Sequence, residues 1–142
     1  MPLLHSIKQL SEKYFSHTQE IRRHLHAHPE LSYNEFNTAK FVAQKLTEYG
    51  LTPTEGIAET GVVAMIEGKN PSIKTIALRA DMDALPIEEA NEVAYKSKTP
   101  GVMHACGHDV HTASLLSASK ILFELRDQFE GSIKLIFQPG EE

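Results

Sequence analysis

The N-terminal part of the chain has the hydrophobic spacing of an amphipathic helix. Over residues 3–28, apolar side chains recur at steps of three and four, with one wider gap, at Leu3, Ile7, Leu10, Tyr14, Ile21 and Leu25. Pro29 ends this helix, because the residue before a proline disfavours helical backbone.

A second helix is predicted from Asn34 to Tyr49. Asn34 and Ser32 are its candidate capping residues, and its apolar face consists of Phe36, Ala39, Val42, Ala43 and Leu46. Gly50 follows the last residue, where helices favour a glycine with left-handed backbone.

After this helix the pattern changes to short apolar runs that predict strands. The run Leu51–Ile57 is weak, whereas Gly61–Glu67, Ile73–Arg79 and Ser132–Phe137 are stronger. Residues 81–108 show little periodicity, and a connection of that length is usually functional or disordered.

A third helix of about 17 residues is predicted to begin at Asp109 as its cap and to end before Gly131. Its inward side chains are Ala113, Leu116, Ile121, Leu122 and Leu125. The order of two helices, three strands, a helix and a strand indicates an α/β fold. We expect about three main helices packed on a mixed sheet of about four strands.

The composition limits the class of protein to which the chain can belong. The chain has 142 residues, 41% hydrophobic and 23% charged, which is typical of one soluble globular domain. A net charge of -5 and the lack of a basic stripe argue against nucleic-acid binding. Cys106 is the single cysteine, so no intramolecular disulfide forms. No apolar run is long enough to span a membrane, and the N-terminus does not resemble a signal peptide; we expect a cytoplasmic protein.

Cys106 and His108 form the first candidate metal-binding pair. Residues two apart in an extended chain point to the same side, and thiolate with imidazole suits zinc and similar ions. The dipole of the following helix is expected to favour the thiolate. The alternative is a buried free cysteine beside a surface histidine; the nearby His104 and His111 favour the metal site.

Two pairs of carboxylates follow predicted strands, where ligands gather in open α/β sheets. Asp81 and Asp83 are candidates to bind a metal, to orient a ligand imidazole or to position a loop; the alternative is a solvated turn. Glu141 and Glu142 are adjacent and are expected to point in opposite directions, so one can bind metal while the other acts as a general base. The alternative is an exposed acidic end.

His24, His26 and His28 are weaker candidates. His24 and His28 have the i, i+4 spacing that permits metal binding, but such histidines are more often on a helix surface or at a satisfied helix end. We therefore do not expect them to be ligands. The sequence contains no Gly-rich phosphate loop and no Gly-x-Ser-x-Gly elbow.

Four segments together resemble the M20 family of metallopeptidases and, within it, the amidohydrolase branch. That branch includes N-acyl-amino-acid amidohydrolases, hippurate hydrolases and auxin-conjugate hydrolases. Each segment alone is a weak signal, but the four occur in the family's order across nearly the whole chain: Arg22–Leu31, Leu78–Pro86, Met103–His111 and Gln138–Glu142.

The resemblance implies a role for each matched residue. Cys106, His108 and Glu142 match ligands of a centre with two divalent ions, which are Zn, Mn, Co or Ni. Glu141 matches the general base, and Asp83 matches the second aspartate of an Asp-x-Asp motif in the active site. Asp81 and Asp83 are expected to support the site rather than to bind metal. Gly140 stands where alanine is common, a difference that we expect to be tolerated.

The resemblance also implies an architecture and a reaction. Residues 1–142 match the N-terminal portion of an αβα-layered, zinc-peptidase-like catalytic domain. The resemblance implies that the rest of that domain lies outside these residues, as does a lid domain through which the parent protein is expected to form a homodimer. The implied reaction is hydrolysis of N-acyl or N-aroyl amino acids, with no nucleic-acid or membrane partner. Two alternatives remain: a catalytically silent metal-binding fragment, and a structural or metal-sensing module.

Overall fold

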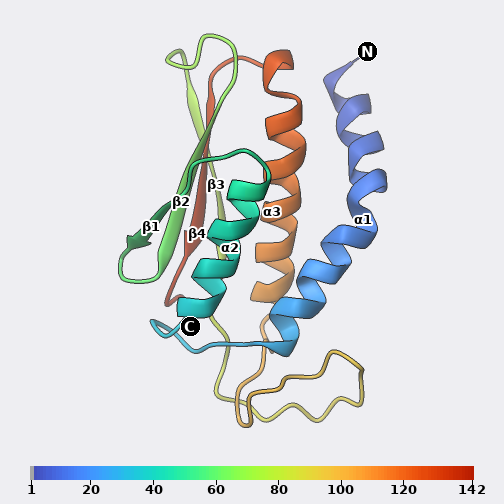
Figure 1. Cartoon of the computed structure of the whole chain (residues 1–142), viewed down its shortest axis with the longest axis vertical. Coiled ribbons are helices and arrows are strands. Elements are labelled where there is room, and N and C mark those ends of the chain that lie inside the picture. Colours follow the sequence, from blue (N-terminus) through green and yellow to red (C-terminus); the bar gives the residue numbers. More distant parts are fainter. Residues whose placement is uncertain (1) are drawn as a thin grey trace.

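The computed structural model describes residues 2–142, which fold into three α-helices and one four-stranded sheet (Figure 1). The helices are α1 (Leu3–Ala27), α2 (Phe36–Glu48) and α3 (His108–Glu124), and a short 3-10 helix, η1 (Arg126–Gln128), follows α3. The strands are β1 (Thr54–Ile57), β2 (Gly61–Glu67), β3 (Thr75–Asp81) and β4 (Ser132–Gln138). The predicted α/β fold and the order of its elements are confirmed.

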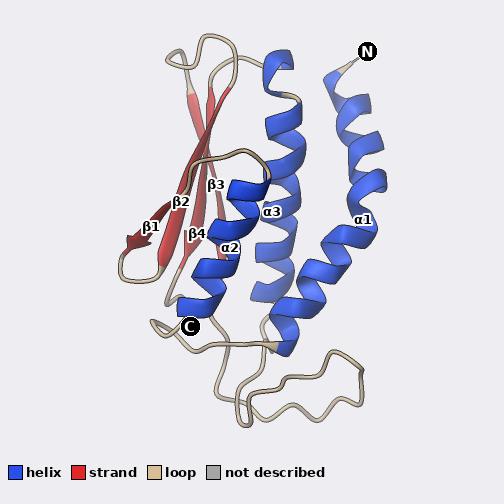
Figure 2. Cartoon of the chain, in the orientation of Figure 1, coloured by secondary structure: helices blue, strands red, loops and turns tan. Residues whose placement is uncertain are grey.

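The sheet is mixed, with the strand order β1-β2-β4-β3. β2 pairs antiparallel with β1 and with β4, whereas β3 and β4 are parallel. A parallel pair needs a long crossover, and here it consists of residues 82–107 followed by α3 (Figure 2). As a result, β3 and β4 present their carboxyl ends at the same edge of the sheet.

The helices form one layer beside the sheet. Helices α2 and α3 pack against the strands, and α1 packs on the outer side of α3 (Figure 1). Alternate residues of β2 point into this interface, so Val62, Ala64 and Ile66 are buried. They meet Leu46 of α2 and Leu116 of α3 in one hydrophobic core. Among residues 2–142, no helix has the length and apolar character needed to cross a membrane.

The start of α2 differs from the prediction. Neither Asn34 nor Ser32 caps the helix, because the carboxylate of Glu30 accepts the backbone N–H groups of Asn37 at 3.2 Å and Thr38 at 2.6 Å. Phe36 is also misassigned: it is 62% exposed, whereas the other four residues predicted for the apolar face are buried. The predicted left-handed glycine after α2 is confirmed, with φ of 93° at Gly50.

The start of α3 also differs from the prediction. The helix begins at His108, and the capping position belongs to Gly107, whose φ of 113° is in the left-handed region. Asp109 lies in the first turn and is 1% exposed. It is not the cap, because its carboxylate is engaged by Arg22 and His26 of α1. At the other end of α3, the predicted inward residue Leu122 is only partly buried.

The strand predictions differ from the structure only at their ends. β2 has the predicted bounds, β1 begins three residues later than predicted, and β4 extends one residue further. β3 is shifted to Thr75–Asp81, so Asp81 is its last residue.

The long connection 82–107 is held to the body of the protein by backbone hydrogen bonds. Leu85 and Met103 exchange N–H and C=O bonds of 2.9 and 3.0 Å across it. The N–H groups of Ala84 and Lys98 donate to Glu30 and Ala27, near the end of α1. The connection therefore has a defined path beside the carboxyl edge of the sheet.

Candidate metal centre

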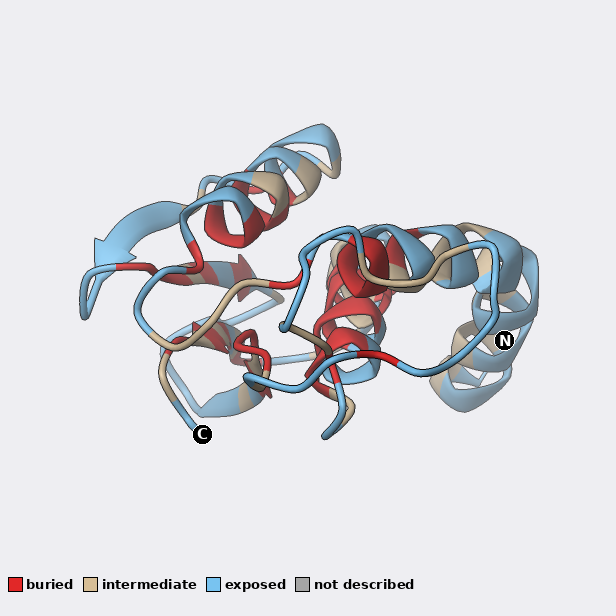
Figure 3. Ribbon diagram, turned by 90° about the horizontal axis from the view of Figure 1, so that it is seen from below, coloured by how far each residue is buried: buried red, intermediate tan, exposed pale blue. Residues whose placement is uncertain are grey.

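Side chains from three segments meet at the carboxyl edge of β3 and β4. This edge is the lower end of the molecule in Figure 1, where the chain ends and where α3 begins. Figure 3 looks onto this end and shows short buried stretches within a mostly exposed connection. Asp83 follows β3, Glu141 and Glu142 follow β4, and Cys106 and His108 lie at the start of α3.

His108 is at the centre of this group and is 3% exposed. Its Nδ1 is 2.9 Å from the main-chain carbonyl oxygen of Asp83, which can only accept a hydrogen bond. Nδ1 therefore carries a proton, and in the neutral imidazole Nε2 has the free lone pair. Nε2 faces Glu141 Oε2 at 3.5 Å and Glu142 Oε1 at 3.8 Å.

Cys106, His108 and Glu142 form a group that fits one metal ion. One ligand atom from each lies within 4.8 Å of the others. Ligand atoms placed about 2.0–2.3 Å from a zinc ion span a similar distance. His108 is buried, while Cys106 and Glu142 are exposed, so an ion would be anchored on the protein side and reachable from solvent.

The thiol of Cys106 does not behave as the sequence suggests. A hydrogen bond with Glu142 raises the pKa of Cys106, and the charges of Glu142, Glu141 and Asp83 add to the effect. These carboxylates act against the thiolate, which the dipole of α3 was expected to favour. A divalent cation among them would supply the opposite charge.

Glu141 and Glu142 do not point in opposite directions, as an extended chain would require. Both carboxylates lie within 4 Å of Nε2 of His108, because the chain leaves the strand after Gln138 and Gly140 adopts a φ of 59°. A Cβ on Gly140 would lie 2.5 Å from Cζ of Tyr33, so an alanine in this conformation would require the Tyr33 ring to move.

Asp83 is fully buried and supports its neighbours. Its Oδ2 accepts from Ser32 Oγ at 2.7 Å and from the N–H of Glu142 at 2.9 Å, and its Oδ1 faces His108 Nδ1 at 3.1 Å. Burial raises the pKa of Asp83, but the hydrogen bonds from Glu142 and Ser32 outweigh this effect, so the pKa is lowered overall. With both oxygens engaged, Asp83 orients one candidate ligand, His108, and fixes the backbone of another, Glu142.

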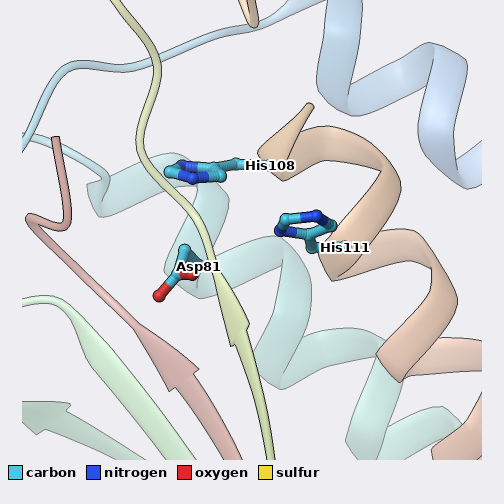
Figure 4. Close-up of side chains that lie close together, drawn as sticks. All are labelled: Asp81, His108 and His111. Atoms are coloured by element: carbon cyan, nitrogen blue, oxygen red, sulfur yellow. The ribbon is translucent and has the colours of Figure 1, made fainter. Parts of the chain in front are cut away.

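Asp81 has different partners from Asp83. Its Oδ1 is 2.8 Å from Nε of Arg79 and forms an ion pair with the same guanidinium. Asp81 also belongs to a second group of metal-capable side chains, with His108 and His111 (Figure 4). In that group Asp81 is paired with Arg79 and Nδ1 of His108 is bonded to Asp83. Only Nε2 of His108 is free to bind a metal, and Nε2 faces Glu142, so the group of Cys106, His108 and Glu142 is the better candidate site.

His26 is a satisfied histidine at the end of α1, which is one of the two alternatives to metal binding that its position in the sequence suggested. The residue is 3% exposed and is not a surface histidine. Its Nδ1 is 2.7 Å from Asp109 Oδ2 and its Nε2 is 2.9 Å from Glu89 Oε1, so it ties α1 to α3 and to the long connection. Its place next to the apolar Leu25 and Ala27, one turn after Arg22, was the available signal.

Glu89 is the partner of His26 on the long connection. Burial raises its pKa, but hydrogen bonds from the N–H of Ser97, from His26 and from Asn91 outweigh burial and lower the pKa to about 2. The carboxylate is therefore charged in the folded protein over the whole neutral range.

The remaining histidines of the sequence analysis lie outside the candidate ligand group. His24 stacks on Phe41 with ring centroids 4.3 Å apart, and His28 donates through Nδ1 to the carbonyl of His24. His104 is buried, and burial lowers its pKa to about 4. Within residues 2–142, neither ring nitrogen of His104 has a hydrogen-bond partner.

Comparison with known proteins points to one enzyme family. Residues 77–142, which contain all five predicted site residues, match the model of peptidase family M20/M25/M40. The chain therefore resembles the M20 family. It is 53% identical over 124 residues to thermostable carboxypeptidase 2 of Saccharolobus solfataricus, covering 87% of this chain and 31% of that protein. It is 48% identical over 136 residues to an N-acyl-L-amino acid amidohydrolase of Geobacillus stearothermophilus, covering 96% and 36%.

A solved M20 structure shows the same fold. The YxeP protein of Bacillus subtilis, a dinuclear metal binding peptidase from the M20 family, superposes with a TM-score of 0.85 at 40% identity. The match covers 90% of this chain and 36% of that one. The chain thus spans about a third of the length of the M20 relatives that it matches.

Proposed function

We propose that the full-length protein that carries this sequence is a metal-dependent amidohydrolase. Its substrates are N-acyl or N-aroyl amino acids, and its products are a carboxylic acid and a free amino acid. The observation that carries the proposal is the meeting of Glu141 and Glu142 with Nε2 of His108, beside the thiol of Cys106. This set combines metal ligands with one further carboxylate that is free for proton transfer.

The donor set fits divalent metal. Cys106, His108 and Glu142 would hold one ion, with Asp83 keeping His108 in the tautomer that presents Nε2. When bound, two divalent ions lower the pKa of water toward about 7 and polarise the amide carbonyl. Thiolate and imidazole suit zinc, and we extend the proposal to manganese, cobalt and nickel, which the resemblance implies.

Glu141 is the proposed general base. Its side chain is 42% exposed and its Oε2 is 3.5 Å from His108 Nε2, so it adjoins the ligand group and remains open to a substrate. Its carboxylate accepts a proton from the attacking water and later gives that proton to the leaving amine nitrogen. Proton transfer by one carboxylate therefore serves both halves of the hydrolysis.

The proposed substrate class draws on two relatives. One is an N-acyl-L-amino acid amidohydrolase and the other a carboxypeptidase. Both names fit cleavage of an amide bond whose nitrogen belongs to an amino acid. N-acetyl amino acids and hippurate are therefore the first substrates to assay, and a short peptide is a useful comparison.

A second proposal concerns residues 1–142 taken alone. They bring together three candidate ligands around Nε2 of His108, which is sufficient for one ion but not for a centre of two. We propose that this part of the protein binds metal weakly and is catalytically silent by itself. The remaining alternative, a metal-sensing module, would require tight metal binding and a metal-dependent change of partner.

One assay separates these proposals. Purified residues 1–142 and the full-length protein are each incubated with Zn, Mn, Co or Ni and with N-acetyl amino acids or hippurate. We expect turnover by the full-length protein that a chelator abolishes, and none by residues 1–142. Clear turnover by residues 1–142 would refute the silent-fragment proposal, and no turnover by the metal-loaded full-length protein would refute the amidohydrolase proposal.

A further inference from the structure

Glu35 is a buried carboxylate that the proposed chemistry leaves unused. It occupies the N-cap position of α2 and is 0% exposed, yet its side chain forms no capping hydrogen bond. The first N–H groups of α2 are instead accepted by Glu30. Since burying a carboxylate is unfavourable unless it is hydrogen-bonded, its actual partners are informative.

The two oxygens of Glu35 bind different parts of the chain. Oε2 accepts from the hydroxyl of Thr60 at 2.7 Å, just before β2, and Oε1 accepts from the N–H of Gly140 at 2.8 Å, just after β4. Hydrogen bonds to an ionised group are stronger than bonds between neutral groups. Glu35 therefore joins the start of α2 to the turn that carries Glu141.

Asp83 holds the same turn from the other side of Glu141. It accepts the N–H of Glu142 at 2.9 Å, so the N–H groups before and after Glu141 are each held by a fully buried carboxylate. Asp83 is in turn held by the hydroxyl of Ser32. Ser32 and Glu35 thus both stabilise the turn that carries Glu141. Ser32 does so through Asp83, and Glu35 does so by a direct hydrogen bond to Gly140.

We propose that Glu35 is a positioning residue for Glu141. By fixing the peptide between Pro139 and Gly140, as Asp83 fixes the peptide between Glu141 and Glu142, Glu35 sets the direction in which the Glu141 carboxylate points. The inference rests on the proposed function, which assigns proton transfer to Glu141. A misplacement of about 1 Å at a reacting group is enough to slow a reaction about 100-fold. Loss of the hydrogen bond between Glu35 and the N–H of Gly140 should therefore lower the reaction rate.

Three variants of the full-length protein isolate this role. Glu35→Leu keeps most of the volume and removes both acceptors. Glu35→Gln keeps a neutral oxygen for Gly140 and offers its amide to the Thr60 hydroxyl, which can also accept. Thr60→Val is the matched control, because it removes the other partner of Glu35 and leaves the bond to Gly140 in place.

The first readout is hydrogen exchange of the Gly140 amide, which needs neither metal nor substrate. We expect exchange about ten-fold faster in Glu35→Leu, an intermediate rate in Glu35→Gln and an unchanged rate in Thr60→Val. If Glu35→Leu does not fold, the exchange rates of the Gly140 amide in wild type, Thr60→Val and Glu35→Gln are sufficient to test the proposal. Exchange should then be faster in Glu35→Gln than in the other two proteins. Equal Gly140 exchange in all folded variants would overturn the proposal.

The second readout is the division between kcat and KM for an N-acetyl amino acid. We expect Glu35→Leu to lower kcat about 10- to 100-fold with little change in KM, Glu35→Gln to restore most of kcat, and Thr60→Val to resemble wild type. An active wild type with unchanged kcat in Glu35→Leu would overturn the positioning role and leave the proposed function intact. A metal-loaded wild type without hydrolysis would instead overturn the proposed function, and the catalytic purpose of Glu35 with it.

Discussion

Nδ1 of His108 donates a hydrogen bond to the main-chain oxygen of Asp83 at 2.9 Å. This bond determines which nitrogen of His108 remains free, and the side chain of Asp83 reinforces it with Oδ1 at 3.1 Å. Because the acceptor is a backbone atom two residues after β3, the path of the main chain fixes the orientation of the imidazole. Groups that orient a ligand histidine strongly affect metal affinity.

Asp83→Asn should weaken metal binding about 10- to 100-fold, the usual effect of removing such an orienting carboxylate. The neutral side chain keeps one acceptor oxygen, but its amide nitrogen cannot accept from His108, Ser32 or Glu142. Competition titration of Zn²⁺ against a chromophoric chelator measures the change. Asp81→Asn is the control, because Asp81 is paired with Arg79; an equal loss of affinity in both variants would contradict the role of Asp83.

Cys106→Ser should abolish the thiolate-to-metal absorption band of the Co²⁺-loaded protein. Cys106 is the single cysteine of this sequence, so within residues 1–142 the band has one source. A spectrophotometric titration with Co²⁺ checks this result. Persistence of the band in Cys106→Ser, measured on residues 1–142, would show that another group accounts for it and would remove Cys106 from the ligand set.

His26→Leu should destabilise the fold by about 3–5 kcal/mol, because it leaves buried Asp109 and Glu89 without their shared partner. Urea unfolding of the full-length protein measures the change. His28→Gln provides the control at an exposed position of the same helix terminus, where about 0.5 kcal/mol or less is expected. Similar values for both variants would rule out the buried network as a source of stability.

Glu89 should stabilise the protein at neutral pH, and this stabilisation should be lost in acid. Its pKa is about 2 in the folded protein and 4.5 as its ordinary value, so its contribution is present above pH 4.5 and is lost as the pH falls toward 2. The free energy of unfolding should therefore fall less steeply in Glu89→Gln than in wild type over this interval. Glu92→Gln, at a side chain that is 92% exposed, should keep the wild-type slope; identical slopes in all three proteins would exclude Glu89.

Much of the fold follows from the sequence because its elements have clear periodicity. Residues 3–28 and 61–67 show the spacing of a buried helix face and of a strand, and the structure places α1 and β2 there. The helix starts were harder to predict, because side chains distant in sequence compete for the capping groups. Glu30 takes the role predicted for Asn34 or Ser32, and Asp109 is bound by Arg22 and His26 instead of capping α3.

At the candidate site too, features that depend on local sequence were predicted, and features that depend on residues distant in sequence were not. Cys106, His108 and the two terminal glutamates were identified because their residue types and spacing suit metal chemistry, and the structure brings them together. Glu35 was not identified, and the buried role of His26 was indicated only by the apolar Leu25 and Ala27 beside it. Their importance comes from partners 105 and 83 residues away, Gly140 and Asp109, and such pairings depend on the tertiary fold.

We propose above all that Glu141 transfers the proton while Cys106, His108 and Glu142 hold metal. The most direct test is kcat of full-length Glu141→Gln for an N-acetyl amino acid, with bound metal measured on the same sample. We expect kcat to fall by about 100- to 10,000-fold while the metal content stays at the wild-type level. A variant that keeps most of the wild-type kcat, with metal bound, would contradict this proposal.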